Sequence, residues 1–203
     1  MRSPVNFITV EEYLELELTA RVRHEYVAGQ IYAMVGASEA HNIIVTNLIA
    51  ILRPYLRGSS CKAFVSDMKV KVKTQQADIF YYPDLLVTCD PGDNEKYFKT
   101  KPSLIIEILS KSTEVTDRRE KRCDPADVSS AKERASRKRL NYQAIDSLQE
   151  YILISQYEMK VEIYFKDGNN NWMFATLGED DDLVLDSVGL KLTMSDIYED
   201  VFY

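Results

Sequence analysis

The sequence predicts an α+β fold in which helices flank a mixed central sheet. Two short apolar runs, Leu85–Val87 and Leu104–Ile106, are separated by a polar, turn-rich segment and are typical of two neighbouring buried strands. An amphipathic helical pattern over 38–52 precedes them, and an apolar strand pattern over 150–155 follows. With 203 residues and 45% apolar content, the chain suits one domain over 1–203 with a substantial core.

The N-terminal part predicts a helix and then a hairpin. Thr9 is a suitable N-cap, and it is followed by two acids and a partial apolar face made by Tyr13, Leu14, Leu16 and Leu18. Gly29 marks a hairpin turn with a return strand over 30–35, and we expect His24 and Glu25 just before this hairpin.

The remaining elements follow from the same two periodicities. The helix over 38–52 ends near Pro54, and the alternation of apolar residues and lysines over 63–73 predicts one half-buried strand. After the two central strands we expect a helix from 129 or 130 to 145, the strand over 150–155, a hairpin of 160–165 with 171–176, a short strand at 183–185 and a terminal helix over 194–201.

Charge and composition restrict the class of protein. The net charge of −7 argues against a protein that coats nucleic acid, but basic residues crowd between Arg118 and Arg139 and could form one local phosphate-facing surface or a solvated helix face. No apolar run approaches the roughly 20 residues that cross a bilayer, and the N-terminus lacks the layout of a secretion signal, so a cytoplasmic protein is expected. We interpret the three cysteines, Cys61, Cys89 and Cys123, as apolar fillers or idle thiols, because their spacing fits neither a zinc pair nor a disulfide framework.

Each of the two central strands carries an acid where a buried strand favours an apolar residue. Asp84 enters the first strand and Glu107 lies inside the second. Two carboxylates side by side in a sheet repel each other and are costly to desolvate unless a cation joins them, and Mg²⁺ would meet that need. The alternative is that Asp84 closes a turn and Glu107 points to solvent at a strand end.

A wider pattern resembles the Uma-two family of restriction endonucleases, which belongs to the PD-(D/E)XK nuclease superfamily. The residues that carry the resemblance span about 6 to 165 and are His24-Glu25-Tyr26, Gly29, Met34, His41, Ser66-Asp67, Tyr82-Pro83-Asp84-Leu85, Glu107-Ile108-Leu109-Ser110, Ser112-Thr113-Glu114, Asp117 and Leu148-Gln149-Glu150-Tyr151. The resemblance implies a restriction-endonuclease-like core.

The resemblance also implies the site residues. Asp84 and Glu107 would be metal ligands for Mg²⁺ or Mn²⁺, and the carbonyl of Ile108 would complete the protein's share. Glu25 would be an outer acid that binds a second metal or orients water. His24, beside Glu25, is expected as an orienting hydrogen-bond partner, and His41 as a cap of the long helix.

The catalytic lysine departs from the superfamily pattern, because the position two residues after Glu107 is Leu109. The resemblance implies a lysine that has migrated to the following helix. Lys121 and Lys138 are both candidates, with Lys121 slightly preferred, and the residues between them, 122–137, form an expected insertion. The lysine would polarise the attacking water or steady the phosphate.

Three functions remain open from the sequence. The first is a metal-dependent endonuclease that hydrolyses DNA phosphodiester bonds and acts as a homodimer with two active sites. The second is a catalytically silent nucleic-acid-binding or protein-interaction module that retains the nuclease fold, which the insertion and the acidic balance would favour. The third is a hydrolase of small phosphodiesters that uses the same acids.

Overall fold

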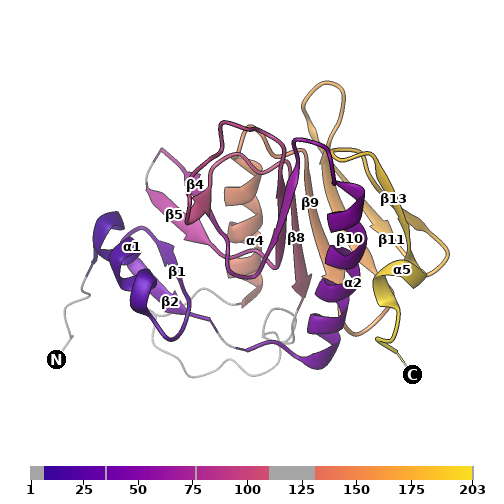
Figure 1. Cartoon of the computed structure of the whole chain (residues 1–203), viewed down its shortest axis with the longest axis horizontal. Coiled ribbons are helices and arrows are strands. Elements are labelled where there is room, and N and C mark those ends of the chain that lie inside the picture. Colours follow the sequence, from indigo (N-terminus) through magenta and orange to yellow (C-terminus); the bar gives the residue numbers. More distant parts are fainter. Residues whose placement is uncertain (1–6, 35, 76, 110–130, 203) are drawn as a thin grey trace.

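The computed structural model describes residues 7–34, 36–75, 77–109 and 131–202, with the backbone alone over 131–136. Its largest sheet has six strands in the order β11-β10-β9-β8-β6-β3 (Figure 1). Strands β8 and β9 are parallel and the other neighbours are antiparallel, which confirms the mixed central sheet. The strands are β3 Lys62–Val65, β6 Leu85–Thr88, β8 Leu104–Leu109, β9 Glu150–Ser155, β10 Val161–Lys166 and β11 Trp172–Leu177.

The two faces of the central sheet are both apolar, because alternate side chains of β6, β8 and β9 point to opposite sides. One face packs against helix α2 (Glu39–Tyr55), through residues such as Leu85, Ile106 and Leu48. The other face packs around helix α4 (Ala131–Gln143) and the turn after it, where Ile105 meets Tyr142. Helix α5 (Met194–Tyr198) joins the first cluster.

A second sheet of five strands lies beside the first, in the order β2-β1-β5-β4-β7. Its strands are β1 His24–Val27, β2 Gln30–Ala33, β4 Lys69–Lys73, β5 Asp78–Tyr81 and β7 Phe98–Lys99. Helix α1 (Val10–Thr19) packs Tyr13 against Tyr26 and Phe80 on one face of this sheet. The other face contributes Val70, Val72, Ile79 and Tyr81 to the cluster around α4. Helix α4 therefore lies between the two sheets, as Figure 1 shows.

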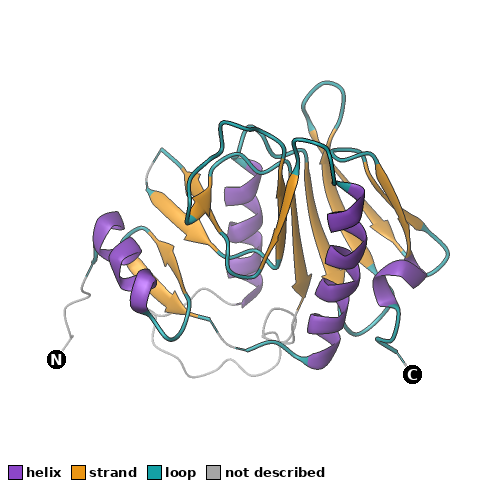
Figure 2. Ribbon diagram, in the orientation of Figure 1, coloured by secondary structure: helices purple, strands orange, loops and turns teal. Residues whose placement is uncertain are grey.

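A third, two-stranded sheet closes the C-terminal part of the fold (Figure 2). It pairs β12 (Asp182–Leu185) with β13 (Leu190–Thr193), and Leu183, Leu185 and Leu192 join the core cluster around α2. Within the described residues, no helix has both the length and the apolarity needed to cross a bilayer.

Several expectations about local structure were wrong. The single strand expected over 63–73 is two strands in different sheets, because the chain turns at Ser66, whose φ is +49°. Lys69, at the start of the second of these strands, is buried. His24 and Glu25 do not precede the hairpin but begin its first strand. Leu16 and Leu18 are exposed, and α1 buries Glu17 instead. Strands β5, β7 and β13 were not predicted. Residues 131–137 of the expected insertion belong to α4, and the rest lies outside the described residues.

The interpretation of Cys61 and Cys89 as idle thiols was also wrong, because these two residues form a disulfide. Strands β3 and β6 pair with Lys62 opposite Thr88, so the residues just outside this pair face each other. The sequence separation of 28 residues gave no sign of this pairing, since it depends on strand register. Cys123 lies outside the described residues.

We predict that reduction of the Cys61–Cys89 disulfide destabilises the protein. A cross-link that closes a loop of this length restricts the unfolded chain, and its loss should lower the free energy of unfolding by about 2–4 kcal/mol. Urea unfolding with and without dithiothreitol measures this difference. The double variant Cys61→Ser/Cys89→Ser should not respond to the reductant, whereas an equal response of both proteins would contradict the prediction.

Candidate active site

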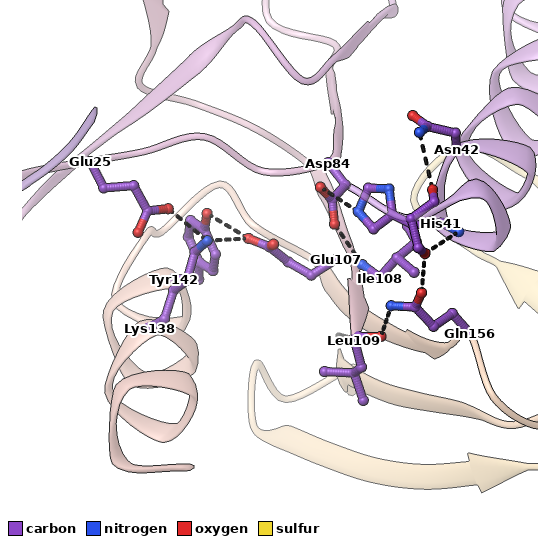
Figure 3. Close-up of polar contacts among 11 residues, drawn as sticks. Glu25, His41, Asn42, Asp84, Glu107, Ile108, Leu109, Lys138, Tyr142 and Gln156 are labelled. Carbon is purple, nitrogen blue, oxygen red and sulfur yellow. Dashed lines mark hydrogen bonds and ion pairs between the residues drawn. The ribbon is translucent and has the colours of Figure 1, made fainter. Parts of the chain in front are cut away.

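Three charged side chains from distant parts of the chain meet between the two sheets (Figure 3). The Lys138 ammonium on α4 lies 2.8 Å from Oε1 of Glu25 on β1 and 2.8 Å from Oε1 of Glu107 on β8. Only 19% of the Lys138 side chain and 14% of the Glu107 side chain are exposed. The cluster therefore forms an ion-pair network that is largely shielded from solvent.

Strand alternation directs both acids toward α4. On β1, Tyr26 faces helix α1, and the neighbouring residue Val27 packs into the cluster around α4. Glu25, two residues before Val27, points to the same side. On β8, Ile106 and Ile108 face α2, so Glu107 between them faces α4. The two acids thus approach α4 from opposite sheets.

Helix α4 presents Lys138 and Tyr142 on one face, since residues four apart lie one above the other. The Tyr142 hydroxyl donates a hydrogen bond of 3.0 Å to Oε1 of Glu107. The Lys138 ammonium lies 5.1 Å from the centre of the Tyr81 ring and 5.8 Å from that of Tyr142. These two aromatic rings leave the ammonium little water and add a favourable cation–π contact. Asn141 fixes Tyr81 by donating a hydrogen bond of 2.8 Å to its hydroxyl.

Burial governs the electrostatics of the cluster. Loss of solvation raises the pKa of Glu107 to about 7, Lys138 opposes this rise and the charge of Asp84 adds to it. Burial lowers the pKa of Lys138, but the charges of Glu107 and Glu25 and the hydrogen bonds to them outweigh it, so the pKa lies well above its ordinary value. Lys138 is therefore cationic at neutral pH, whereas Glu107 gains or loses its proton near neutral pH.

Asp84 lies beside this cluster at the point where β6 begins. The antiparallel ladder pairs Leu85 with Ile106, and Oδ2 of Asp84 accepts a hydrogen bond of 2.7 Å from the backbone N–H of Ile108. The carboxylate thus serves as the acceptor for β8 where the backbone pairing with β6 has ended. Its Oδ1 lies 3.0 Å from Nε2 of His41. Figure 3 shows the Asp84 carboxylate against His41, while the Glu107 side chain extends toward Lys138 and Tyr142.

His41 reaches Asp84 from the first turn of α2. Burial lowers the pKa of His41, but the hydrogen bond and charge of Asp84, with the charge of Glu107, reverse this effect and the net pKa is raised. The first turn is itself anchored to the end of β8. The Ser38 hydroxyl donates to Oε1 of Gln156, and Nε2 of Gln156 donates a hydrogen bond of 2.6 Å to the carbonyl of Leu109. This network holds His41 in position beside the sheet.

The structure brings together most of the residues that the sequence singled out. Glu25, Glu107 and Lys138 are in contact, and Asp84 is adjacent, but its carboxylate is engaged by His41 and Ile108. Lys121 lies outside the described residues. In the described part of the chain, no three His, Cys, Asp or Glu side chains lie close enough together to hold a metal ion.

The expected role of His41 as a helix cap was wrong, and the hydrogen-bond partner of His24 is Glu17 and not Glu25. The His24 ring contacts Glu17 on the α1 side of the sheet, away from Glu25, because neighbouring strand residues point to opposite faces. The N-cap of α2 is Ser38, whose hydroxyl accepts the backbone N–H of His41. The contact of His41 with Asp84 was missed, as it joins a helix to a strand end without any local sequence signal. Tyr142 was also missed as a site residue, although its spacing from Lys138 was a usable signal.

The basic run between Arg118 and Arg139 is described only at its end. Arg137 is exposed, Lys138 is enclosed by the site, and the Arg139 guanidinium lies 4.7 Å from the centre of the Tyr164 ring. These three neighbouring residues therefore have different environments, and they do not form one uniformly solvated helix face.

We predict that the stability of Glu107→Gln relative to the wild type depends on pH. With its pKa raised from 4.5 to about 7, folded Glu107 holds a proton more tightly than the unfolded chain does. Its contribution to stability is therefore complete at acidic pH and is lost as the pH rises through about 7. Chemical denaturation in chelator measures this at pH 5 and at pH 8. Between these two pH values, the free energy of unfolding of the wild type should fall by up to about 3 kcal/mol relative to that of Glu107→Gln. A stability difference that is equal at the two pH values would contradict this.

Comparison with known proteins identifies the family. The family model Uma2, described as "Putative restriction endonuclease", matches residues 10–195. An uncharacterized protein of Synechocystis sp. is 34% identical over 197 residues, covering 97% of this chain and 94% of the relative. A second uncharacterized Synechocystis protein is 32% identical over 173 residues, covering 84% of this chain and 87% of the relative.

A solved structure supports the fold. The crystal structure of "a putative nuclease belonging to DUF820" from Anabaena variabilis covers 96% of this chain and 99% of its own, with a TM-score of 0.67 and 18% identity. The predicted α+β, restriction-endonuclease-like fold is thereby confirmed. From the extent of the family match, the chain belongs to the Uma2 family.

Proposed function

We propose that the protein is a metal-dependent endonuclease that hydrolyses DNA phosphodiester bonds. The observation that carries this proposal is the contact of Lys138 with both Glu25 and Glu107, at 2.8 Å each, beside Asp84. Acids and a lysine are the groups that phosphodiester hydrolysis needs, to hold a cation and to stabilise the phosphate and the attacking water. The family description is consistent with this chemistry.

The donor set fits a hard divalent cation. Glu25 and Glu107 contact the single Lys138 ammonium and Asp84 lies near Glu107, so the site has more carboxyl groups than Lys138 alone offsets and a cation would balance the excess. Carboxylate and carbonyl oxygens are the ligands that Mg²⁺ and Mn²⁺ prefer. Asp84, Glu107 and the carbonyl of Ile108 would hold the ion, with Glu25 as an outer acid. When bound, such an ion supplies activation of water and stabilisation of developing negative charge.

The chain's own residues prepare the site around that ion. The elevated pKa of Lys138, caused by the two glutamates against the effect of burial, keeps it cationic and able to donate hydrogen bonds to a phosphate oxygen or to the attacking water. Tyr142 restrains Glu107 through its hydroxyl, and Ile108 and His41 restrain the two oxygens of Asp84. These contacts fix the acids before substrate arrives, which reduces the entropy cost of the reaction.

We predict that the protein nicks or linearises supercoiled plasmid with Mg²⁺ and loses this activity with chelator. Asp84→Asn and Glu107→Gln should abolish cleavage, because each removes a ligand oxygen of the ion. Lys138→Met should lower the rate by about 10²-fold or more, since a positioned donor to the reacting phosphate is lost. Agarose gel assays over a time course measure all three.

The matched control is Lys191→Met. Lys191 is also ion-paired, 2.6 Å from Asp182, but it lies exposed on β13, so its loss should leave cleavage unchanged. Lys121→Met tests the competing lysine and should retain activity if Lys138 serves the site. Binding of plasmid without cleavage would favour a silent binding module instead, and cleavage of small phosphodiesters alone would favour the third function.

We further predict that Mn²⁺ stabilises the wild type and not Asp84→Asn. A ligand at about 100 times its Kd stabilises the folded state by about 2.7 kcal/mol, which is a clear rise in Tm. Thermal unfolding with Mn²⁺ and with chelator measures it. Asp180→Asn, an exposed carboxylate in the turn before β12, is the control and should respond as the wild type does. An equal Mn²⁺ response in Asp84→Asn would contradict the proposed ligand.

A further inference from the structure

A second polar cluster lies behind the proposed active site, around the buried carboxylate of Glu17. The Glu17 side chain is only 1% exposed. Its Oε1 lies 2.9 Å from the ring Nδ1 of His24, and its Oε2 accepts hydrogen bonds from the Tyr82 hydroxyl at 2.7 Å and the His24 backbone N–H at 3.4 Å. One carboxylate on helix α1 thus binds both β1 and the chain just after β5.

The charge of Glu17 is met by a buried lysine through Tyr82. The Lys69 ammonium donates a hydrogen bond of 3.1 Å to the Tyr82 hydroxyl, which in turn donates to Glu17. Lys69 and Tyr82 are 6% and 2% exposed. A chain of largely buried hydrogen bonds favours one geometry over its alternatives, because breaking a bond leaves a buried polar group without a partner. The cluster is therefore suited to fix the positions of the segments that it joins.

Those segments carry the proposed catalytic acids. His24 is followed by Glu25, and Tyr82 is followed, after Pro83, by Asp84. The backbone pairing of β1 with β5 joins Tyr26 to Phe80 and Val27 to Ile79, and the acids lie beyond it. Continuation of this antiparallel register places His24 opposite Tyr82. Glu17 joins these two residues by side-chain hydrogen bonds in the region that the ladder does not cover.

The cluster and the site occupy opposite faces of the same sheet. His24 and Tyr82 point to α1, whereas Glu25 and Tyr81, the adjacent residues, point to α4 and contact Lys138. In the described part of the chain, Glu17 contacts His24 and Tyr82 and not the acids, and it lies on the face of the sheet away from a substrate bound on the α4 side. Any effect of Glu17 on the reaction must pass through the backbone of β1 and of residues 82–84.

We propose that Glu17 is a positioning residue that sets the distance between Glu25 and Asp84. This proposal rests on the proposed function, because it assigns the Glu17 cluster to the same site. A Gln at this position cannot accept hydrogen bonds on both terminal atoms, so it cannot hold His24 and Tyr82 together as the carboxylate does. Residues that orient metal ligands from outside typically contribute 10–100-fold to metal affinity or activity.

The test compares Glu17→Gln with a matched control, Glu150→Gln. Glu150 is also buried, at 3% exposure, and accepts hydrogen bonds from Asp186 and Ser187. It lies at the start of β9, whereas the β9 partner of Glu107 is Leu153. Plasmid cleavage is measured as a function of Mn²⁺ concentration, at a temperature where each variant is folded. Glu17→Gln should raise the Mn²⁺ concentration for half-maximal cleavage by 10–100-fold, and Glu150→Gln should leave it unchanged.

Tyr82→Phe keeps the proposal testable if Glu17→Gln does not fold. It removes only the hydroxyl that donates to Glu17, and it should shift the same Mn²⁺ midpoint in the same direction by a smaller factor. In the double variant the two shifts should not multiply, because both break one hydrogen bond. If Glu17→Gln has the same Mn²⁺ midpoint as Glu150→Gln, the positioning role is overturned. Where Glu17→Gln does not fold, the same comparison is made between Tyr82→Phe and Glu150→Gln. Absence of cleavage by the wild type at any Mn²⁺ concentration would instead overturn the proposed function, and the positioning role with it.

Discussion

The burial of the Lys138 ammonium between two glutamates is the interaction on which the arrangement of the site depends. A cation removed from water is costly unless carboxylates and aromatic faces compensate it, and here Glu25, Glu107 and two tyrosine rings do so. The same contact joins β1 of one sheet, β8 of the other and the helix between them. Loss of Lys138 would leave two carboxylates without their cation, and loss of either glutamate would leave the ammonium with a single carboxylate, so the three elements are coupled electrostatically as well as by packing.

The position of α4 between the sheets makes this coupling possible. Its residue Tyr142 fills the space between Tyr81 and Tyr151, and Lys138 extends over the rings of Tyr81 and Tyr142 toward the acids. The central sheet accepts helices on both faces because its core strands are apolar on both sides. Asp84 and His41 complete the site from the α2 side, where the pairing of β6 with β8 ends. The acids thus gather where strands end and two layers of the fold meet.

Sequence reasoning found the acids more readily than their partners. Asp84 and Glu107 were conspicuous because each is a carboxylate at or inside an apolar strand, and those two strands follow each other as the central apolar runs of the sequence. Lys138 was one of two candidates, and the direction of α4 brings it into contact with Glu25 and Glu107, whereas Lys121 lies outside the described residues. His41 was assigned to a helix cap because its contact with Asp84 depends on how α2 lies against the sheet. The Cys61–Cys89 disulfide was missed for the same reason, since it depends on register.

The sequence by itself determined the type and order of most elements, the two-sided burial of the central strands and the presence of acids on them. These features are local, because the alternation of a strand and the periodicity of a helix are written in neighbouring residues. Only the tertiary structure decided that 63–73 divides between two sheets, that Lys138 bridges Glu25 and Glu107, and that Glu17 joins His24 to Tyr82. Each of these depends on contacts between residues far apart in the chain, as with the 113 positions between Glu25 and Lys138, and such contacts form only when complete elements pack.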